Sequence, residues 1–184
     1  MFLDSDDVLM PQAIARLNVA IEKNKADLIS TDIVEETLAP EQQVIPADKS
    51  KTWLHGKIYR TQFLRKHHIQ FNTTLRTNED LAFNLTVYAY EPESYFLPEQ
   101  LYLWRANQES ITRHKGNDAV LQKCNSIDYI MAIYDAYTHY PEGKLTALMI
   151  GNILNCYNFW QRGEIYGTLT DQAKICVNKM LHNP

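Results

Sequence analysis

The spacing of apolar residues changes near Asp118, and this change constrains the fold more than any single motif. Before Asp118, short apolar runs alternate with helical patterns and with polar loops that contain proline. After it, the spacing predicts helices only, over residues 119–137, 145–160 and 171–181, with Thr170 as the cap of the last helix. We therefore predict an α/β domain over residues 1–116, followed by an all-helical extension over residues 117–184.

The first thirty residues predict a strand, a helix and a second strand. Phe2–Leu3 has the character of the end of a buried strand, and residues 27–30 that of a short second strand. Between them Pro11 can start a helix, in which Ile14, Leu17, Ala20 and Ile21 recur at helical spacing. Such a unit is typical of parallel sheets.

The middle of the chain is more irregular. Residues 34–51 contain two prolines and no clear period, which predicts a surface excursion. Helices are expected over residues 61–66 and from Asn78 onward, since Asn78 is a good cap. Two strands are expected at residues 95–97 and 101–105.

Composition excludes several classes of protein. The 184 residues carry a net charge of -4, so the chain lacks the basic face that nucleic-acid binding requires. Three widely spaced cysteines suggest a reducing compartment, and acidic residues directly after Leu3 argue against a signal peptide. No apolar run is long enough for a transmembrane segment, so we expect a cytoplasmic protein.

The acidic segment Asp4–Ser5–Asp6–Asp7 follows an apolar dipeptide directly. Carboxylates at the end of a strand can hold a hard divalent cation against the phosphates of a ligand. In an extended chain Asp4 and Asp6 share one side, whereas Asp7 faces elsewhere unless the loop turns. The alternative is a solvated acidic turn that caps the following helix.

A second acidic pair, Glu79 and Asp80, follows Asn78 at the start of a predicted helix. The helix dipole favours the ionised carboxylate there, which suits a general base that takes a proton from an acceptor hydroxyl. The alternative is that both acids only stabilise the helix.

Two further clusters could contact a ligand. Trp53 offers a ring for stacking on a sugar, and Lys57 could approach phosphate oxygens, although a Trp and Tyr59 buried in a core are equally ordinary. Arg113 and His114 lie in a polar loop that could close over a diphosphate or form a surface turn.

The order of these segments resembles a known family. The segments are Phe2–Leu3–Asp4–Ser5–Asp6–Asp7 with Pro11, Trp53–Leu54–His55–Gly56–Lys57–Ile58–Tyr59–Arg60, Phe71, Asn78–Glu79–Asp80, Leu101–Tyr102–Leu103–Trp104–Arg105 and Ser110–Ile111–Thr112. Together they resemble the family 2 glycosyltransferases with the GT-A fold, over roughly residues 1 to 115. The resemblance implies a partial GT-A-like mixed sheet with flanking helices. It also implies inverting transfer of a sugar from a nucleotide-diphosphate donor to a hydroxyl of a saccharide or glycoconjugate acceptor, assisted by Mg²⁺ or Mn²⁺.

The resemblance also implies roles for single residues. Asp4 and Asp6 match the DxD motif, with Asp6 as the metal ligand and Asp4 toward the metal or the donor. Asp80, with Glu79, matches the acidic pair that supplies the base. Trp53 and Tyr59 match the acceptor side, and Lys57, Arg113 and His114 the diphosphate side.

In the family, the elements that grip the nucleoside precede the acidic motif. This sequence departs from that pattern, because no such elements precede Asp4. Their absence should weaken donor binding and leave an open sheet edge, so we expect a homodimer or a complementing chain. The alternative function is a catalytically incompetent remnant or a module that binds an acceptor or partner. A purely structural helical scaffold is the third reading. A location at the inner membrane surface would suit a glycoconjugate acceptor.

Overall fold

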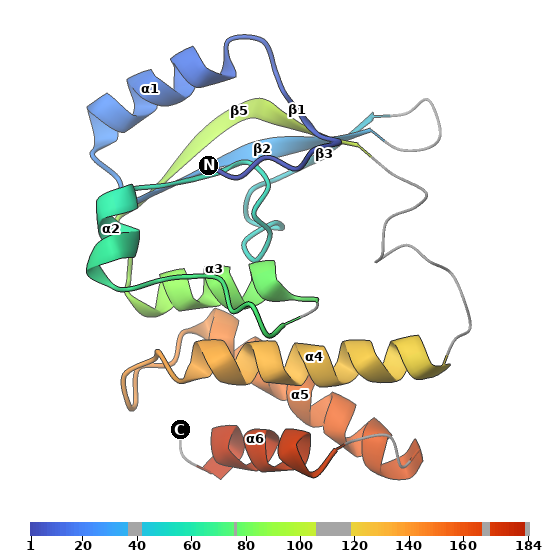
Figure 1. Ribbon diagram of the computed structural model, residues 1–184. Helices are drawn as coiled ribbons and strands as arrows, with labels where there is room; N and C mark the ends of the chain where they lie inside the picture. The colour runs from blue at the N-terminus through green and yellow to red at the C-terminus, as the bar shows by residue number, and fades with distance from the viewer. Residues whose placement is uncertain (37–41, 76, 106–118, 167–169, 183–184) are drawn as a thin grey trace. The chain divides into compact units, whose positions relative to one another are not determined.

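The computed structural model describes residues 1–36, 42–75, 77–105, 119–166 and 170–182 (Figure 1). The chain divides into two compact units. The first comprises Met1–His68 and Pro92–Gly116, and the second Ile69–Glu91 and Asn117–Pro184. Each unit has its own core and is described by itself.

The first unit is built on a mixed sheet, which has five strands within the described residues. The strands are β1 (Val8–Leu9), β2 (Leu28–Glu36), β3 (Gln42–Ile45), β4 (Lys57–Tyr59) and β5 (Ser94–Arg105). Their order is β1-β5-β2-β3, and β4 pairs with the start of β2. Only β2 and β5 run parallel, and the other pairs are antiparallel.

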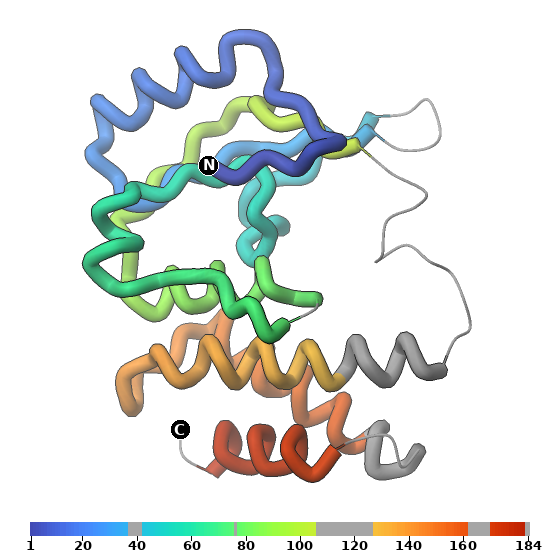
Figure 2. Tube along the Cα trace, viewed as in Figure 1, coloured from blue at the N-terminus to red at the C-terminus, as the bar shows by residue number. Residues whose placement is uncertain are grey.

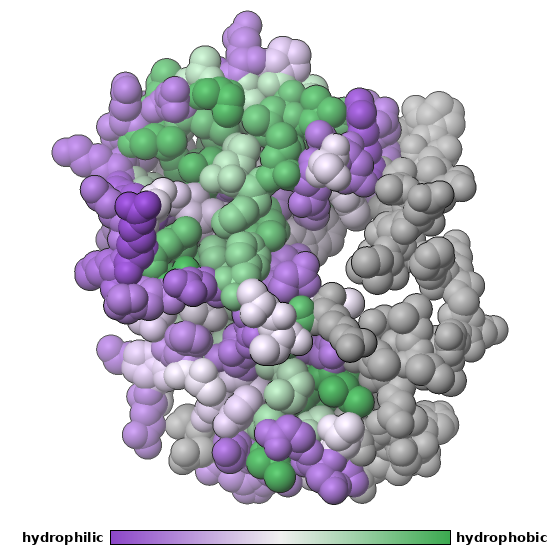
Figure 3. All heavy atoms as spheres, in the orientation of Figure 1, coloured by the Kyte–Doolittle hydropathy of each residue, from purple (hydrophilic) through white to green (hydrophobic). Residues whose placement is uncertain are grey.

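Helix α1 (Ala13–Asn24) packs on this sheet through Ala13, Leu17 and Ala20. Their small and branched side chains contact Leu101 of β5 and Ile29 of β2. The expected helix is therefore confirmed, but Ile14 and Ile21 are exposed rather than part of the core. Apolar side chains are visible on the surface around α1 in Figure 3. A short helix, α2 (Thr61–Lys66), also matches its prediction.

Several strand predictions are wrong. Phe2–Leu3 does not form a strand, and β1 is antiparallel to β5, so the first thirty residues are not a parallel unit. Residues 34–51 are not only a surface excursion, because β2 continues to Glu36 and β3 pairs with it. The two strands expected after residue 94 are one, in which the register slips between Leu97 and Gln100. This bulge accommodates Pro98, which has no N–H to donate.

The second unit contains α3 (Glu79–Ala89), α4 (Ala119–Tyr137), α5 (Ala147–Tyr166) and α6 (Asp171–His182). A single core joins them, with Leu81 and Leu85 of α3 packed among apolar side chains of the other helices. Figure 2 shows α3 running alongside α4. The helical extension is confirmed, and Thr170 Oγ1 accepts a hydrogen bond from the Ala173 amide at 3.3 Å, as a cap does.

Residues 69–91, assigned by sequence to the first domain, belong by their contacts to this helical unit. Within the described residues, no helix combines the length and the apolar character needed to cross a bilayer.

Candidate functional site

The acidic segment forms a tight turn. The Asp7 amide donates to the Asp4 carbonyl oxygen at 3.2 Å, and Ser5 and Asp6 form the exposed tip. The turn breaks the alternation of an extended chain, so the side chains of Asp4 and Asp7, rather than those of Asp4 and Asp6, come together. Asp6 is exposed and does not belong to this group.

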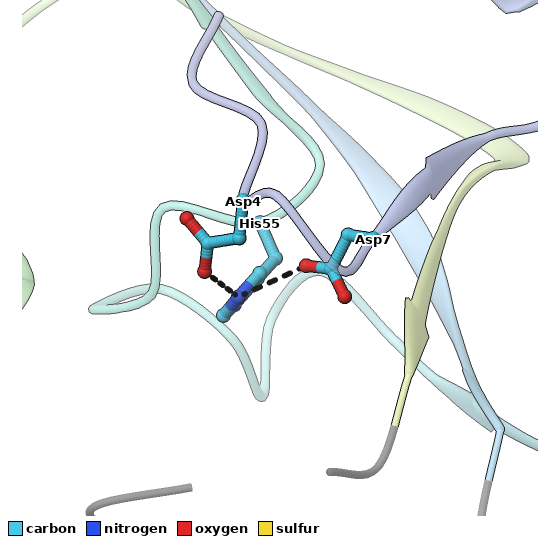
Figure 4. A group of neighbouring side chains, drawn as sticks. All are labelled: Asp4, Asp7 and His55. Atoms are coloured by element: carbon cyan, nitrogen blue, oxygen red, sulfur yellow. Dashed lines mark ion pairs between the residues drawn. The ribbon is translucent and has the colours of Figure 1, made fainter.

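His55 lies between the two carboxylates (Figure 4). Its Nε2 atom is 3.4 Å from Asp4 Oδ2 and 3.7 Å from Asp7 Oδ2. One ligand atom from each of the three residues lies within 4.8 Å of the others. Among the described residues, these three form the group of acidic, histidine or cysteine side chains that could hold a metal ion.

Asp7 is held by two donors from β5. Tyr102 Oη donates to Asp7 Oδ2 at 2.6 Å, and the Arg105 amide donates to Asp7 Oδ1 at 2.9 Å. Asp7 is only 8% exposed, so these bonds replace the water that a buried carboxylate loses. The orientation of Asp7 is therefore fixed before any ligand binds.

Tyr102 connects the Asp7 carboxylate to the backbone of Asp4. Its hydroxyl oxygen also accepts a hydrogen bond from the Asp4 amide at 3.4 Å. Burial raises the pKa of Tyr102 well above its ordinary value, and the hydrogen bond to Asp7 raises it further. The phenol therefore stays protonated and remains a donor to Asp7.

Aromatic rings orient His55. Its ring lies 5.4 Å from those of Tyr102 and Trp104 and 6.2 Å from that of Trp53, measured between centroids. The Nδ1 atom is buried and has no hydrogen-bond partner among the described residues. Ring packing, rather than a hydrogen bond to Nδ1, thus directs Nε2 at the carboxylates.

Gly56 brings this loop close to the sheet. Its φ of 65° is left-handed, and its carbonyl oxygen accepts a hydrogen bond from the Thr31 amide at 2.9 Å. A Cβ atom at this position would lie 2.9 Å from Thr31 Oγ1. Only glycine meets both requirements without strain, which places His55 against the acidic turn.

The other predicted residues of this loop are mostly enclosed. Lys57 is 1% exposed, and its Nζ donates to the carbonyl oxygens of Ser50 and, at 2.6 Å, Trp53. Tyr59 is buried with its ring 5.8 Å from that of Phe2. Trp53 is half-buried, with its ring 5.5 Å from that of Trp104. In this arrangement the Lys57 ammonium stabilises the loop that carries Trp53 and His55.

The second acidic pair begins α3 in the helical unit. Asn78 has a left-handed φ of 63° and makes no side-chain capping hydrogen bond. Asp80 Oδ1 accepts a hydrogen bond from the Leu81 amide at 2.7 Å, and Glu79 is exposed. The two acidic clusters lie in different units, so their convergence on one pocket stays a prediction. Arg113 and His114 lie outside the described residues.

The donor set suits a hard or borderline divalent cation. Two carboxylates and an imidazole nitrogen are accepted by Mn²⁺, while Mg²⁺ prefers oxygen ligands only. Asp7 keeps lone pairs for a cation, because each of its oxygens accepts one hydrogen bond from the donors named above. The residues present therefore fit a metal-assisted site.

Comparisons with known proteins bear on the fold. No protein-family model matches the chain, and no curated protein sequence matches it. Among solved structures, that of TarS 1–349 from S. aureus in complex with UDP-GlcNAc matches with a TM-score of 0.58 and 15% identity, covering 89% of this chain and 48% of that one. The complex of TarS 1–349 with UDP matches with a TM-score of 0.54 and 15% identity, covering 89% and 46%.

TarS is a staphylococcal glycosyltransferase, and the likeness shows that this chain has a partial GT-A-like fold. The expected fold class is thus confirmed. The chain spans less than half the length of each of these two TarS structures.

Sequence reasoning assigned no role at this site to His55, Tyr102 or Trp104, and it brought Asp7 to the side of Asp4 only if the loop turned. A turn signal at Ser5–Asp6 would have paired Asp4 with Asp7. The contacts of His55 and Tyr102 are long-range and leave no periodic trace in the sequence.

Proposed function

We propose that this chain is part of a metal-assisted inverting glycosyltransferase. It would transfer a sugar from a nucleoside-diphosphate donor to a hydroxyl of a saccharide or glycoconjugate. The observation that carries the proposal is the Asp4–Asp7–His55 group on a GT-A-like sheet. The complexes of TarS with UDP and UDP-GlcNAc support the choice of donor class.

Asp4, Asp7 and His55 would hold the cation, and Asp6 stays a candidate ligand at the tip of the turn. A bound Mn²⁺ or Mg²⁺ supplies positive charge that stabilises a diphosphate leaving group. Trp53 would support the acceptor, and Lys57 would keep the loop of Trp53 and His55 in place.

Asp80 is the proposed base. Its carboxylate would take the proton of the acceptor hydroxyl as that oxygen bonds to the anomeric carbon. The bond from that carbon to the diphosphate breaks with its electrons, so the nucleoside diphosphate leaves and the configuration inverts. The hydrogen bond from the Leu81 amide would orient the Asp80 carboxylate for this step.

Calorimetry with UDP-GlcNAc and Mn²⁺ tests the metal site. We expect heat of binding only when both are present, and at least a tenfold loss of affinity, roughly 1.4 kcal/mol, in Asp7→Asn. The affinity of Asp6→Asn, measured in the same way, shows whether the exposed Asp6 carboxylate contributes to binding as the buried Asp7 carboxylate does. Asp48→Asn, an exposed acid in the loop after β3, is the matched control and should bind like the wild type.

The base is tested separately by turnover. Asp80→Asn should lower turnover by roughly two orders of magnitude or more while the heat of donor binding stays the same. Unchanged turnover would remove Asp80 from the mechanism. Silence across a panel of nucleotide sugars with Mn²⁺ would contradict the proposal and support a non-catalytic module that binds an acceptor or partner.

A further inference from the structure

The first step concerns the direction of two helices in the helical unit. Near the start of α3, Thr77 Oγ1 donates to Asp128 Oδ2 of α4 at 3.3 Å. Just after its end, Tyr90 Oη lies 3.3 Å from His139 Nδ1, just beyond α4. The sequence separation between the two partners is nearly the same in both contacts. The start of α3 therefore faces the earlier residue of α4 and its end the later one, so α3 and α4 run parallel and in register.

The second step is the apolar seam between these contacts. Leu81, Leu85 and Ala89 of α3 belong to the same buried core as Ile130 and Ile133 of α4. Apolar packing is non-directional and tolerates sliding along a helix axis, whereas hydrogen bonds at both ends do not. The polar contacts therefore set the axial position of α3 on α4.

The third step is the use of the Asn78 side chain. Its Nδ2 donates to Thr77 Oγ1 at 3.1 Å instead of capping α3. The Thr77 hydroxyl thus accepts from Asn78 and donates to Asp128, in a chain that ends on a carboxylate. The Asn78 carbonyl oxygen in turn accepts from the Ala82 amide at 3.0 Å, so the chain is continuous with the first turn of α3.

We propose that Asp128 is a positioning residue for Asp80, acting through Thr77 and the left-handed Asn78. The inference rests on the proposed function, in which Asp80 is the base. It gives the helical extension a role in the reaction: α4 fixes the turn from which the acidic pair projects. Asp128 acts on this turn and not on the reacting atoms.

The decisive comparison uses uncharged substitutions in the full chain. Thr77→Val removes the hydroxyl and keeps the shape, whereas Thr77→Ser keeps the hydroxyl. The readout is the Leu81 amide proton in NMR spectra, whose resonance shifts as Asp80 ionises because this amide donates to Asp80 Oδ1. We expect most of that pH-dependent shift to be lost in Thr77→Val and kept in Thr77→Ser.

A matched control lies at the other end of the same helix pair. Tyr90→Phe removes the contact with His139 but leaves the start of α3 intact, so the Leu81 shift should persist. Asp128→Ala should behave like Thr77→Val, and Asp135→Ala on the same helix should behave like the wild type. If Thr77→Val and Asp128→Ala keep the full shift, or if Tyr90→Phe loses it, the proposal is overturned.

Measurements of kcat distinguish a failure of the positioning role from a failure of the proposed function. In hydrolysis of UDP-GlcNAc with Mn²⁺, Thr77→Val should lower kcat by roughly 10- to 100-fold with little change in KM. A wild-type kcat in Thr77→Val, beside an inactive Asp80→Asn, overturns the positioning role and leaves the function standing. If the wild type is inactive, the proposed function fails, and the Leu81 shift still decides the positioning role.

Discussion

A single hydroxyl group, that of Tyr102, organises the acidic turn. It donates to Asp7 and accepts from the Asp4 amide, so one buried atom contacts both ends of the turn. A hydrogen bond to an ionised acceptor contributes more than one between neutral groups. The stability of the first unit and the geometry of the proposed metal site therefore depend on the same residue.

Tyr102→Phe should lower the free energy of unfolding by about 1.5–3 kcal/mol, because it leaves the buried Asp7 carboxylate without one donor. It should also weaken Mn²⁺ binding by roughly 10- to 100-fold, as expected when the partner of a metal ligand is removed. Urea unfolding and electron paramagnetic resonance of Mn²⁺ measure the two effects. Tyr95→Phe on the same strand is the control, and equal losses in both variants would contradict the prediction.

The sequence located the acidic turn but not its geometry. The pairing of Asp4 with Asp6 assumed an extended chain, whereas a turn pairs Asp4 with Asp7. Their partners lie far along the chain: His55 is in the loop before β4, and Tyr102 is in β5. Spacing within a segment cannot show which distant side chain completes a cluster.

Among the elements, the helices follow local rules closely. The predicted bounds of the helix at residues 119–137 are those of α4, because helical periodicity is a property of one segment. Strands depend on partners elsewhere, so β3 went unrecognised, and two strands were expected on either side of Pro98 where β5 is a single strand. In the structure, a bulge absorbs that proline.

Helix α5 contains a glycine that packing does not require. A Cβ atom at Gly151 would meet nothing within 4 Å, and the backbone there is helical. Gly151→Ala should therefore raise the free energy of unfolding by about 0.5–1 kcal/mol. Urea unfolding of the variant and the wild type measures this difference in free energy.

Gly143 provides the contrast. Its Cβ would also meet open space, but its φ of 72° is left-handed. Gly143→Ala should lower the free energy of unfolding by about 1–2 kcal/mol. Changes of the same sign in both variants would show that backbone conformation does not govern the two sites.

At the scale of the whole molecule, the response to alkali depends on two enclosed ionisable groups of the helical unit, whose pKa values are raised. Burial raises the pKa of Cys156 in α5 to about 12, from an ordinary value of 9.0. Burial also raises the pKa of Tyr88 in α3 to about 12, from 10.0, and the nearby Tyr140 adds to the shift. Both groups fold in the neutral form, and the unfolded chain ionises first as the pH rises.

The helical unit should therefore lose stability in alkali. Its full stability is present below pH 9 and falls as the pH rises toward about 12, because the unfolded state then binds fewer protons than the native state. Urea midpoints from pH 8 to 11, followed by circular dichroism, measure the slope. The double variant Tyr88→Phe with Cys156→Ala should flatten it, and an unchanged slope would assign the alkaline loss to other groups.

The division of the chain was only partly visible in the sequence. The periodicity change near Asp118 marks the return of the chain to helices, but residues 69–91 also pack with them. Leu81 and Leu85 give α3 an apolar face, and nothing in that face shows which core it enters. Membership of a unit is decided by contacts between distant segments.

The position of β5 bears on biosynthesis. This strand lies between β1 and β2 and supplies both donors to Asp7, yet it is the last strand of the sheet to be translated. In a nascent chain that has not reached Arg105, β2 can already pair with β3 and β4, whereas β1 and the acidic turn lack the strand that holds them. Chaperones at the ribosome would therefore meet an unclosed sheet until β5 has emerged.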